Sequence, residues 1–226
     1  MAAMTNMAVI FDMDGVLIDS YEAHFISWTG LYRELQLEYT EADFAADFGR
    51  TSRDILARRF GAELLDDRIH DLDARKEALF RDSIRESFPA MDGARELIDA
   101  LAAAGFRLAV GSSGPPENIA LCLEKLERGS KFGAVVTGRD VTRGKPDPQV
   151  FQLAAQRLGV EPCDCVVVED AVHGITAAKA AGMSSVGLTG TATREQLAAA
   201  NLVVDSLREL SPERLRSLIS SRARST

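Results

Sequence analysis

The chain has 226 residues and a formal net charge of −8, and 46% of its residues are hydrophobic. This is enough apolar content for a substantial core, in one large domain or in a domain with an insertion. The negative charge argues against a nucleic-acid or anionic-membrane surface, and no stretch approaches the roughly 20 apolar residues of a membrane span.

The start of the chain and its cysteines indicate a compartment. The first six residues carry no positive charge and run directly into an apolar stretch, unlike a secretory signal peptide. Cys122, Cys163 and Cys165 form neither an even disulfide framework nor a zinc pattern. We therefore expect reduced cysteines and a cytoplasmic protein.

The first predicted element is the apolar run of residues 8–11, which ends abruptly at Asp12 and Asp14, followed by Gly15. The run is too short for a helix and does not alternate, so it predicts a buried strand of a parallel sheet. Two charges at the end of a buried strand are costly unless a divalent cation, a cationic ligand or exposure at a cleft compensates them. Taken alone, the two acids are equally well explained as ordinary turn residues.

Residues 20–88 carry helical patterns and no convincing strand. Apolar residues recur at helical spacing from Phe25 to Leu35, and Thr51 to Asp54 resembles a capping box that opens another helix. This segment is far longer than an ordinary loop between a strand and a helix. We interpret it as a helical cap domain inserted into a core domain, with the cap at residues 19–88 and the core at residues 1–18 and 89–226.

From residue 94 onward, predicted helices alternate with predicted strands. Helices are expected from Ala94 to a stop at Gly105, from Pro116 through Leu126, from Pro148 to Leu158, and from Ile175 to Ala181. Strands are expected at residues 107–111, 134–137, 165–168, 185–188 and 202–204. The alternation predicts an α/β fold, with a Rossmann-like, mostly parallel sheet covered by helices on both faces. A short helix and a frayed basic tail are expected from Ser211 to Thr226.

Polar residues suited to phosphate chemistry follow three of the predicted strands. They are Asp12 and Asp14 after the first strand, Ser112 and Ser113 after the second, and Glu169 and Asp170 after the fourth. Parallel strands bring these ends to one edge of the sheet, where ligands bind in open α/β sheets. Lys145 lies just before a helix, so it can join the same edge.

The residue types suggest a chemistry for this edge. Carboxylate oxygens of Asp12 and Asp170, with a backbone carbonyl nearby, suit Mg²⁺. One Asp can attack phosphorus to form an aspartyl-phosphate, and Asp14 fits a general acid/base role because crowding by like charges raises a carboxyl pKa. Ser112 offers a hydroxyl and backbone N–H donors for a phosphate, and Lys145 supplies positive charge.

These motifs, in this order, resemble those of the haloacid dehalogenase superfamily. They are Asp12-Met-Asp14-Gly-Val, Ser112 after its strand, Lys145-Pro-Asp-Pro, and Glu169-Asp170 with Gly174. The resemblance covers nearly the whole chain. It implies that Asp12 is the nucleophile, that Asp14 is the general acid/base and contacts Mg²⁺ through its backbone carbonyl, and that Ser112 and Lys145 match the phosphate-binding positions. It also implies that Glu169 and Asp170 are the acidic pair of the metal site, with Glu169 either a ligand or a residue behind the ligands.

The helical insertion resembles the C1-type cap of the β-phosphoglucomutase-like and sugar-phosphate phosphatase branch. His24, Arg53 and Lys76 resemble substrate-contacting cap positions of that branch. Each of the three also allows a simpler role: His24 can be a hydrogen-bonded residue at the domain junction, Arg53 can pair with a nearby carboxylate, and Lys76 can lie on a solvated helix face. Pro115-Pro116 departs from the mutase pattern, which has Lys-Asn at these positions.

The sequence therefore predicts a Mg²⁺-dependent phosphohydrolase that acts on a small phosphorylated metabolite, such as a sugar phosphate. We expect it to be a monomer or weak homodimer. The alternative is a β-phosphoglucomutase-type isomerase. A dehalogenase needs neither Mg²⁺ nor an acid/base at Asp14. A receiver-like signalling module would be about half this length and would not need a helical lid.

Overall fold

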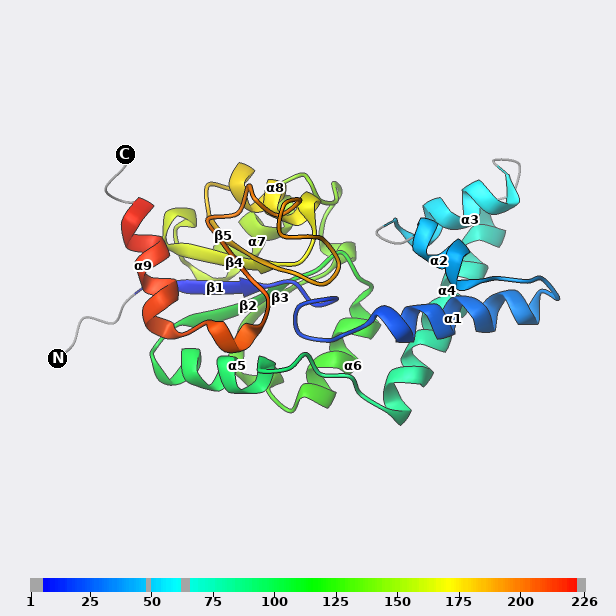
Figure 1. Cartoon of the computed structure of the whole chain (residues 1–226), viewed down its shortest axis with the longest axis horizontal. Coiled ribbons are helices and arrows are strands. Elements are labelled where there is room, and N and C mark those ends of the chain that lie inside the picture. Colours follow the sequence, from blue (N-terminus) through cyan, green and yellow to red (C-terminus); the bar gives the residue numbers. More distant parts are fainter. Residues whose placement is uncertain (1–5, 48–49, 62–65, 223–226) are drawn as a thin grey trace. The chain divides into compact units, whose positions relative to one another are not determined.

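The computed structural model describes residues 6–47, 50–61 and 66–222 (Figure 1). The expectations for the first residues and for the end of the basic tail lie partly outside these ranges. The chain divides into two compact units, one of Met1–Asp19 with Ala90–Thr226 and one of Ser20–Pro89. We refer to them as the core unit and the helical unit.

The core unit is built on a sheet that has six strands in the described residues. They are β1 (Ala8–Phe11), β2 (Arg107–Gly111), β3 (Phe132–Val136), β4 (Cys165–Glu169), β5 (Ser184–Leu188) and β6 (Leu202–Val204). The strands lie in the order β3-β2-β1-β4-β5-β6, and each of these neighbouring pairs is parallel. This is the doubly wound arrangement of Rossmann-like sheets, so the predicted fold class is confirmed.

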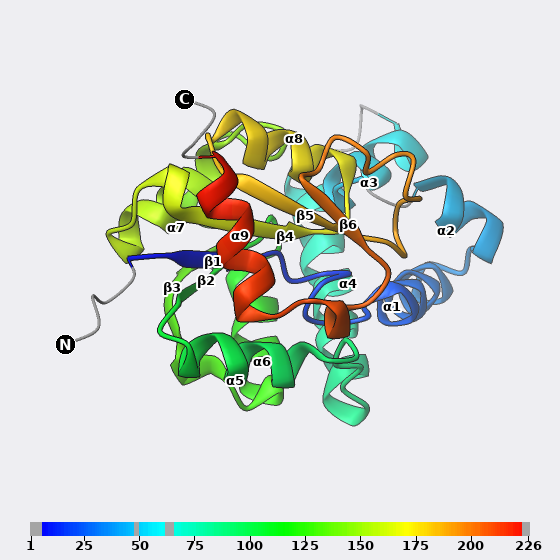
Figure 2. The ribbon, with the colours of Figure 1, turned by 60° about the vertical axis from the view of Figure 1, so that its left-hand side comes forward.

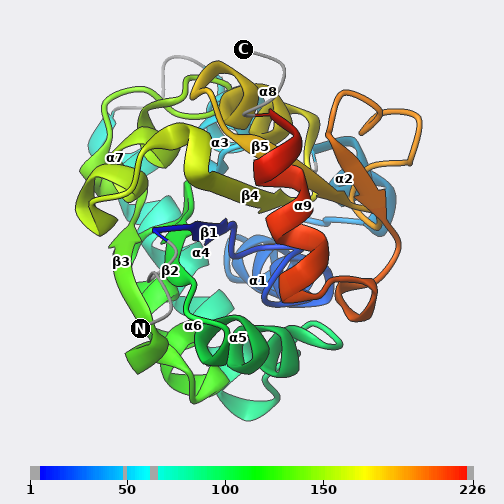
Figure 3. The same cartoon turned by 90° about the vertical axis from the view of Figure 1, so that its left-hand side faces the viewer.

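Helices cover both faces of the sheet (Figures 2 and 3). The helix α7 (Gln149–Leu158) packs on β1, β2 and β3, and α8 (Val172–Ala180) packs beside it on β4 and β5. On the other face, α5 (Ala94–Ala103) lies against β2, and α9 (Pro212–Arg222) lies against β4 and β5. The helix α6 (Pro116–Leu126) runs beside α5. Short 3₁₀ turns complete the unit: η1 (Gly129–Lys131), η2 (Gly138–Asp140), η3 (Pro162–Asp164) and η4 (Leu207–Glu209).

The two central strands are buried on both faces, which explains why they read as unbroken apolar runs. Every residue of β1 and of β4 is buried. One buried cluster joins side chains of these strands to α7 and α8, with Phe151 of α7 fully buried in it. Strands held this firmly give the residues that follow them fixed positions.

The helical unit has its own small core. It consists of α1 (Tyr21–Glu34), α2 (Glu41–Asp47), α3 (Ser52–Phe60) and α4 (Asp66–Glu86), with α1 packed along α4. Trp28, Leu31 and Leu56 belong to its buried cluster. As predicted, α3 begins at a Thr51 cap: Thr51 Oγ1 accepts a hydrogen bond from Asp54 N (3.2 Å) and donates one to Asp54 Oδ2 (2.7 Å).

Two further expectations concern the described residues. The three cysteines are free thiols, with Cys122 and Cys165 buried and Cys163 exposed. Across the described ranges, no helix combines the length and apolar content that crossing a bilayer requires.

Candidate active site

The candidate site lies where β1 and β4 run side by side at the centre of the sheet. The strand order reverses at this point, and ligands of open α/β sheets bind there, at the carboxyl ends of the strands. Asp12 directly follows β1, and its backbone N–H donates to Val168 O of β4 (3.0 Å). Asp170 directly follows β4. The two aspartates therefore lie close together although 157 residues lie between them in the sequence.

Three carboxylates form the centre of the site. Oxygens of Asp12, Glu169 and Asp170 lie within 4.8 Å of one another. Glu169 is fully buried and Asp170 is 5% exposed. Such crowding of buried acids is costly unless positive charge compensates it.

Lys145 supplies one positive charge. Its Nζ lies 2.7 Å from Glu169 Oε1 and 3.0 Å from Asp12 Oδ1. The ring centroid of Phe151 is 4.9 Å from the same nitrogen. Burial alone would lower the pKa of Lys145, but the carboxylates of Asp12 and Glu169 outweigh it and raise that pKa, so the lysine stays charged.

Both carboxylate oxygens of Glu169 accept hydrogen bonds from neighbouring groups. Its Oε1 accepts from Lys145, and its Oε2 accepts from the backbone N–H groups of Asp170 (2.9 Å) and Ala171 (2.8 Å). A Cβ at Gly174 would overlap the Glu169 carboxylate, so the glycine in the last motif leaves the room that this side chain occupies. These contacts favour a role for Glu169 behind the ligands, fixing Lys145 and the loop that carries Asp170.

Asp12 and Asp170 have perturbed acidities. Desolvation by burial raises the pKa of Asp12 from 3.8 to about 7; Lys145 opposes the shift, and Glu169 and Asp14 add to it. Desolvation also raises the pKa of Asp170 well above its ordinary value, with Glu169 and Asp12 adding to the shift and Thr191 opposing it. The charge of one lysine therefore does not offset the burial of Asp12 and Asp170.

The donor set fits a hard divalent cation. Asp12 Oδ1 is buried and ion-paired with Lys145 Nζ, 3.0 Å away. This carboxylate oxygen beside two further carboxylates makes an all-oxygen site of the kind Mg²⁺ prefers. The side chain of Asp14 is not part of this cluster: its Oδ2 lies 3.8 Å from an ideal Cβ built on Gly114, on the side of the Ser112 loop.

The loop after β2 is fixed by backbone contacts. Ser112 is 2% exposed, its N–H donates to Val136 O (3.0 Å), and its Oγ accepts from Gly114 N (3.1 Å). Gly138 N donates to Gly114 O (3.0 Å), and a Cβ at Gly138 would overlap Ser113 O. Ser113 itself is exposed. Pro115 and Pro116, which follow at the start of α6, have no N–H to offer an anion.

In the helical unit, the structure brings two of the three predicted cap residues together. Lys76 Nζ lies 2.9 Å from His24 Nδ1 and 2.9 Å from Glu77 Oε1, and the His24 ring stacks on Phe80 with centroids 4.3 Å apart. Lys76 is only 2% exposed, so the alternative of a solvated helix face is wrong. The cause is local: Trp28 and Phe80 cover the ammonium group, with ring centroids 5.5 and 5.6 Å from it.

Arg53 lies exposed on α3. The nearby carboxylates that it could pair with are Asp54, which accepts from Thr51 Oγ1, and Asp47, which pairs with Arg58 and Arg59 at 3.6 Å in each case. The role of Arg53 in binding substrate therefore stays a prediction.

One residue at the site was not indicated by any motif. Thr191, on the loop after β5, makes a side-chain hydrogen bond to Asp170. One of three threonines in this loop carries no spacing signal, and only the parallel pairing of β4 and β5 reveals that it is a neighbour of Asp170.

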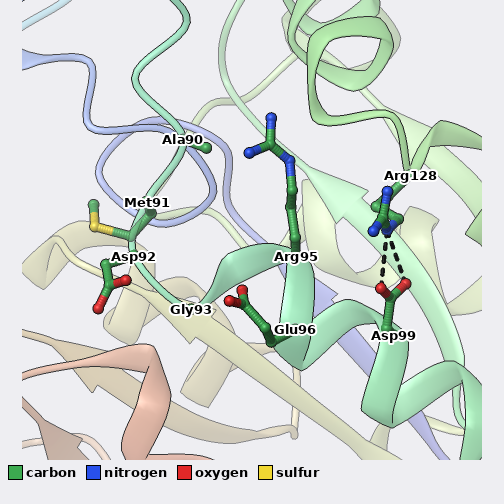
Figure 4. A pocket seen from close by; sticks show the side chains of 8 residues that line it. All are labelled: Ala90, Met91, Asp92, Gly93, Arg95, Glu96, Asp99 and Arg128. Carbon is green, nitrogen blue, oxygen red and sulfur yellow. Dashed lines mark hydrogen bonds and ion pairs between the residues drawn. The ribbon is translucent and has the colours of Figure 1, made fainter.

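A separate surface hollow of about 380 Å³ lies beside α5 (Figure 4). Its charged groups are already engaged: Arg128 Nε lies 2.9 Å from Asp99 Oδ1, Asp92 pairs with Arg208, and Arg95 donates to the carbonyls of Lys125 and Leu126. None of the residues after β1, β2 or β4 lines it. We therefore place the candidate site at the sheet edge and not in this hollow.

Comparison with known proteins identifies the class. The sequence model of the haloacid dehalogenase-like hydrolases matches residues 7–182. The chain belongs to this family. The predicted resemblance is thus confirmed.

Individual relatives refine this placement. Validoxylamine A 7'-phosphate phosphatase of Streptomyces hygroscopicus subsp. limoneus is 33% identical, over 89% of this chain and 94% of that enzyme. Beta-phosphoglucomutase of Bacillus subtilis is 31% identical, over 92% and 93% respectively. The crystal structure of beta-phosphoglucomutase from Clostridium difficile superposes with a TM-score of 0.83 at 26% identity, covering 96% of this chain and 98% of that one. The chain thus resembles both phosphatases and mutases along nearly its full length.

The raised pKa of Asp12 makes the stability of the metal-free protein depend on pH. Between about pH 4 and 7 the unfolded chain has lost the Asp12 proton while the folded chain retains it, so stability falls as the pH rises through this range. Asp12→Asn removes this loss. The variant should therefore exceed the wild type in free energy of unfolding by more at pH 8 than at pH 4.5, measured by urea denaturation in EDTA. Asp19→Asn, a change at an exposed carboxylate, is the control. An equal difference at both pH values for Asp12→Asn would contradict the prediction.

Proposed function

We propose that this protein is a Mg²⁺-dependent phosphohydrolase that acts on a small phosphorylated metabolite, of the sugar-phosphate class, through an aspartyl-phosphate on Asp12. The observation that carries the proposal is the cluster of Asp12, Glu169 and Asp170 with Lys145 at the reversal point of the sheet. Related phosphatases that act on phosphorylated carbohydrates and similar compounds support this reaction and substrate class.

In the first step, a carboxylate oxygen of Asp12 attacks the phosphorus of the substrate. The Asp12 O–P bond forms while the bond from phosphorus to the leaving oxygen breaks, and Asp14 donates its proton to that oxygen. In the second step, Asp14 takes a proton from water, whose oxygen attacks phosphorus and breaks the Asp12 O–P bond. Inorganic phosphate leaves, and Asp12 and Asp14 return to their starting states.

The other residues of the site bind the phosphoryl group or balance its negative charge. The ammonium of Lys145 lies against Asp12, where it can balance the charge that spreads over the phosphoryl oxygens. Ser112 and the backbone around Ser113 can donate to the phosphoryl group from the neighbouring strand end. Asp12, Asp170 and the backbone carbonyl of Asp14 would hold Mg²⁺, which when bound polarises the phosphoryl group and offsets the carboxylate charge.

A β-phosphoglucomutase-type isomerase is the second candidate. The relative from Bacillus subtilis and the structure from Clostridium difficile favour it, as both match along nearly the full chain. Pro115-Pro116 argues against it, because neither residue carries a charge or an N–H for a second phosphate. A receiver-like module has no support, since the family match covers residues 7–182 and a separate helical unit is present.

Asp12→Asn should abolish turnover while the fold is retained. An amide cannot attack phosphorus as a carboxylate does, so we expect kcat to fall on the order of 10⁴-fold or more. Rates of phosphate release with a responsive sugar phosphate measure this, and circular dichroism checks the fold. A well-folded Asp12→Asn protein with a near-normal rate would exclude the covalent mechanism.

Asp170→Ala should weaken the dependence on Mg²⁺. It removes a carboxylate that an octahedral ion could replace only with water, so the Mg²⁺ concentration for half-maximal rate should rise at least about tenfold. EDTA should abolish the activity of the wild type, and added Mg²⁺ should restore it. Full activity in EDTA would overturn the metal assignment.

The phosphatase and mutase candidates make opposite predictions for β-glucose 1-phosphate. We expect inorganic phosphate to form faster than glucose 6-phosphate, with a trace of the 1,6-bisphosphate present, because a poorly retained intermediate leaves Asp12 open to water. Following both products in one reaction distinguishes the two. Other phosphorylated sugars are tested in parallel, because an enzyme specific for another sugar would not react with this one. Glucose 6-phosphate forming much faster than phosphate would favour the mutase.

A further inference from the structure

The loop after β5 reaches the acidic cluster at Asp170. This aspartate stands at the end of β4, and the neighbouring strand β5 ends at Leu188, three residues before Thr191. The side chain of Thr191 hydrogen-bonds to Asp170. Because a carboxylate accepts and a hydroxyl donates, the donor in this bond is Thr191 Oγ1.

The absence of a side chain at Gly15 leaves room for the Asp170 carboxylate and the Thr191 hydroxyl. A Cβ built on Gly15 would overlap Asp170 Oδ2 and would lie 3.1 Å from Thr191 Oγ1. Both oxygens therefore face the Gly15 backbone, which has φ of +70°. The turn after β1, the end of β4 and the loop after β5 thus converge at one point.

The loop is held in place without any contribution from Asp170. Thr189 N donates to Val204 O (2.9 Å), a backbone contact that does not involve the Thr189 side chain. Arg194 Nη1 donates to Val203 O (2.9 Å). Anchored to β6 in this way, the loop presents Thr191 to Asp170 from a fixed position, as a preorganised site requires.

We propose that Thr191 is a positioning residue of the cation site: its hydroxyl fixes the orientation of the Asp170 carboxylate so that an oxygen is directed toward Asp12. The inference rests on the proposed function only in taking the cation to be divalent. It concerns a position outside the family match, which ends at residue 182, and outside every motif of the sequence.

Thr191 itself is exposed, so changes there should leave the fold intact. Thr191→Val keeps the shape and removes the donor, and Thr191→Ser keeps the donor. Thr189→Val is the matched control, because it removes another Thr–Asp hydrogen bond from the same loop, one that goes to Asp205 and not to Asp170.

The test is Mn²⁺ binding to the full-length protein without substrate, followed by electron paramagnetic resonance. We expect Thr191→Val to weaken binding about tenfold, as losses of ligand-orienting contacts do. Thr191→Ser should restore affinity to within about threefold, and Thr189→Val should bind like the wild type. Wild-type affinity in Thr191→Val, equal weakening in both valine variants, or failure of the serine to rescue would each overturn the proposal.

Failure of the proposed function would look different. If the wild type binds Mn²⁺ but releases no phosphate from any sugar phosphate, the function is wrong and the Thr191 result still stands. If phosphate release is observed, Thr191→Val should raise the Mg²⁺ concentration for half-maximal rate and leave kcat at saturating Mg²⁺ nearly unchanged. A fall in kcat alone, with unchanged metal dependence, would contradict a positioning role.

Discussion

The structure of the core unit depends on the burial of three carboxylates around one lysine. The ammonium of Lys145 contacts Asp12 and Glu169, but desolvation by burial, with neighbouring carboxylates adding to it, still raises the pKa values of Asp12 and Asp170. A protein built only for stability would not gather these groups, because buried charges are favourable only when fully compensated. The arrangement is typical of a functional site, and it would suit the binding of a cation next to a phosphoryl group.

Two glycines are required by that crowding. A side chain at Gly174 would occupy the place of the Glu169 carboxylate, and one at Gly15 would occupy the place of Asp170 Oδ2. Gly15 also has a positive φ, which other residues adopt at a cost. The requirement for glycine at both positions is therefore steric: each leaves space for a carboxylate that belongs to the end of β4.

Much of the core unit could be predicted from the sequence, because strands buried on both faces give unbroken apolar runs and the polar residues after them stand out. The rest depends on contacts that no local pattern records. The burial of Lys76 arises from Trp28 and Phe80 on two different helices, so a lysine on a charged helix looked solvated. The short helix α2 has too few residues to show a period of its own within the helical segment. Thr191 was missed because its importance comes from the pairing of β5 with β4.

The start of α6 bears on which acceptor takes the phosphoryl group. Pro115 and Pro116 remove two N–H donors from a helix end that would otherwise attract an anion, and Gly114 N is already engaged by Ser112 Oγ. Arg139, on the turn that packs on Gly114, is paired with Glu117 at 2.7 Å. The groups that remain suit one phosphoryl group next to Asp12 better than a second, distal phosphate at this edge. A charge-assisted hydrogen bond to a phosphate is typically worth about 1.5–3 kcal/mol, so a site without one would retain a bisphosphate roughly tenfold less well or worse. In the proposed mechanism, water would then have time to reach Asp12.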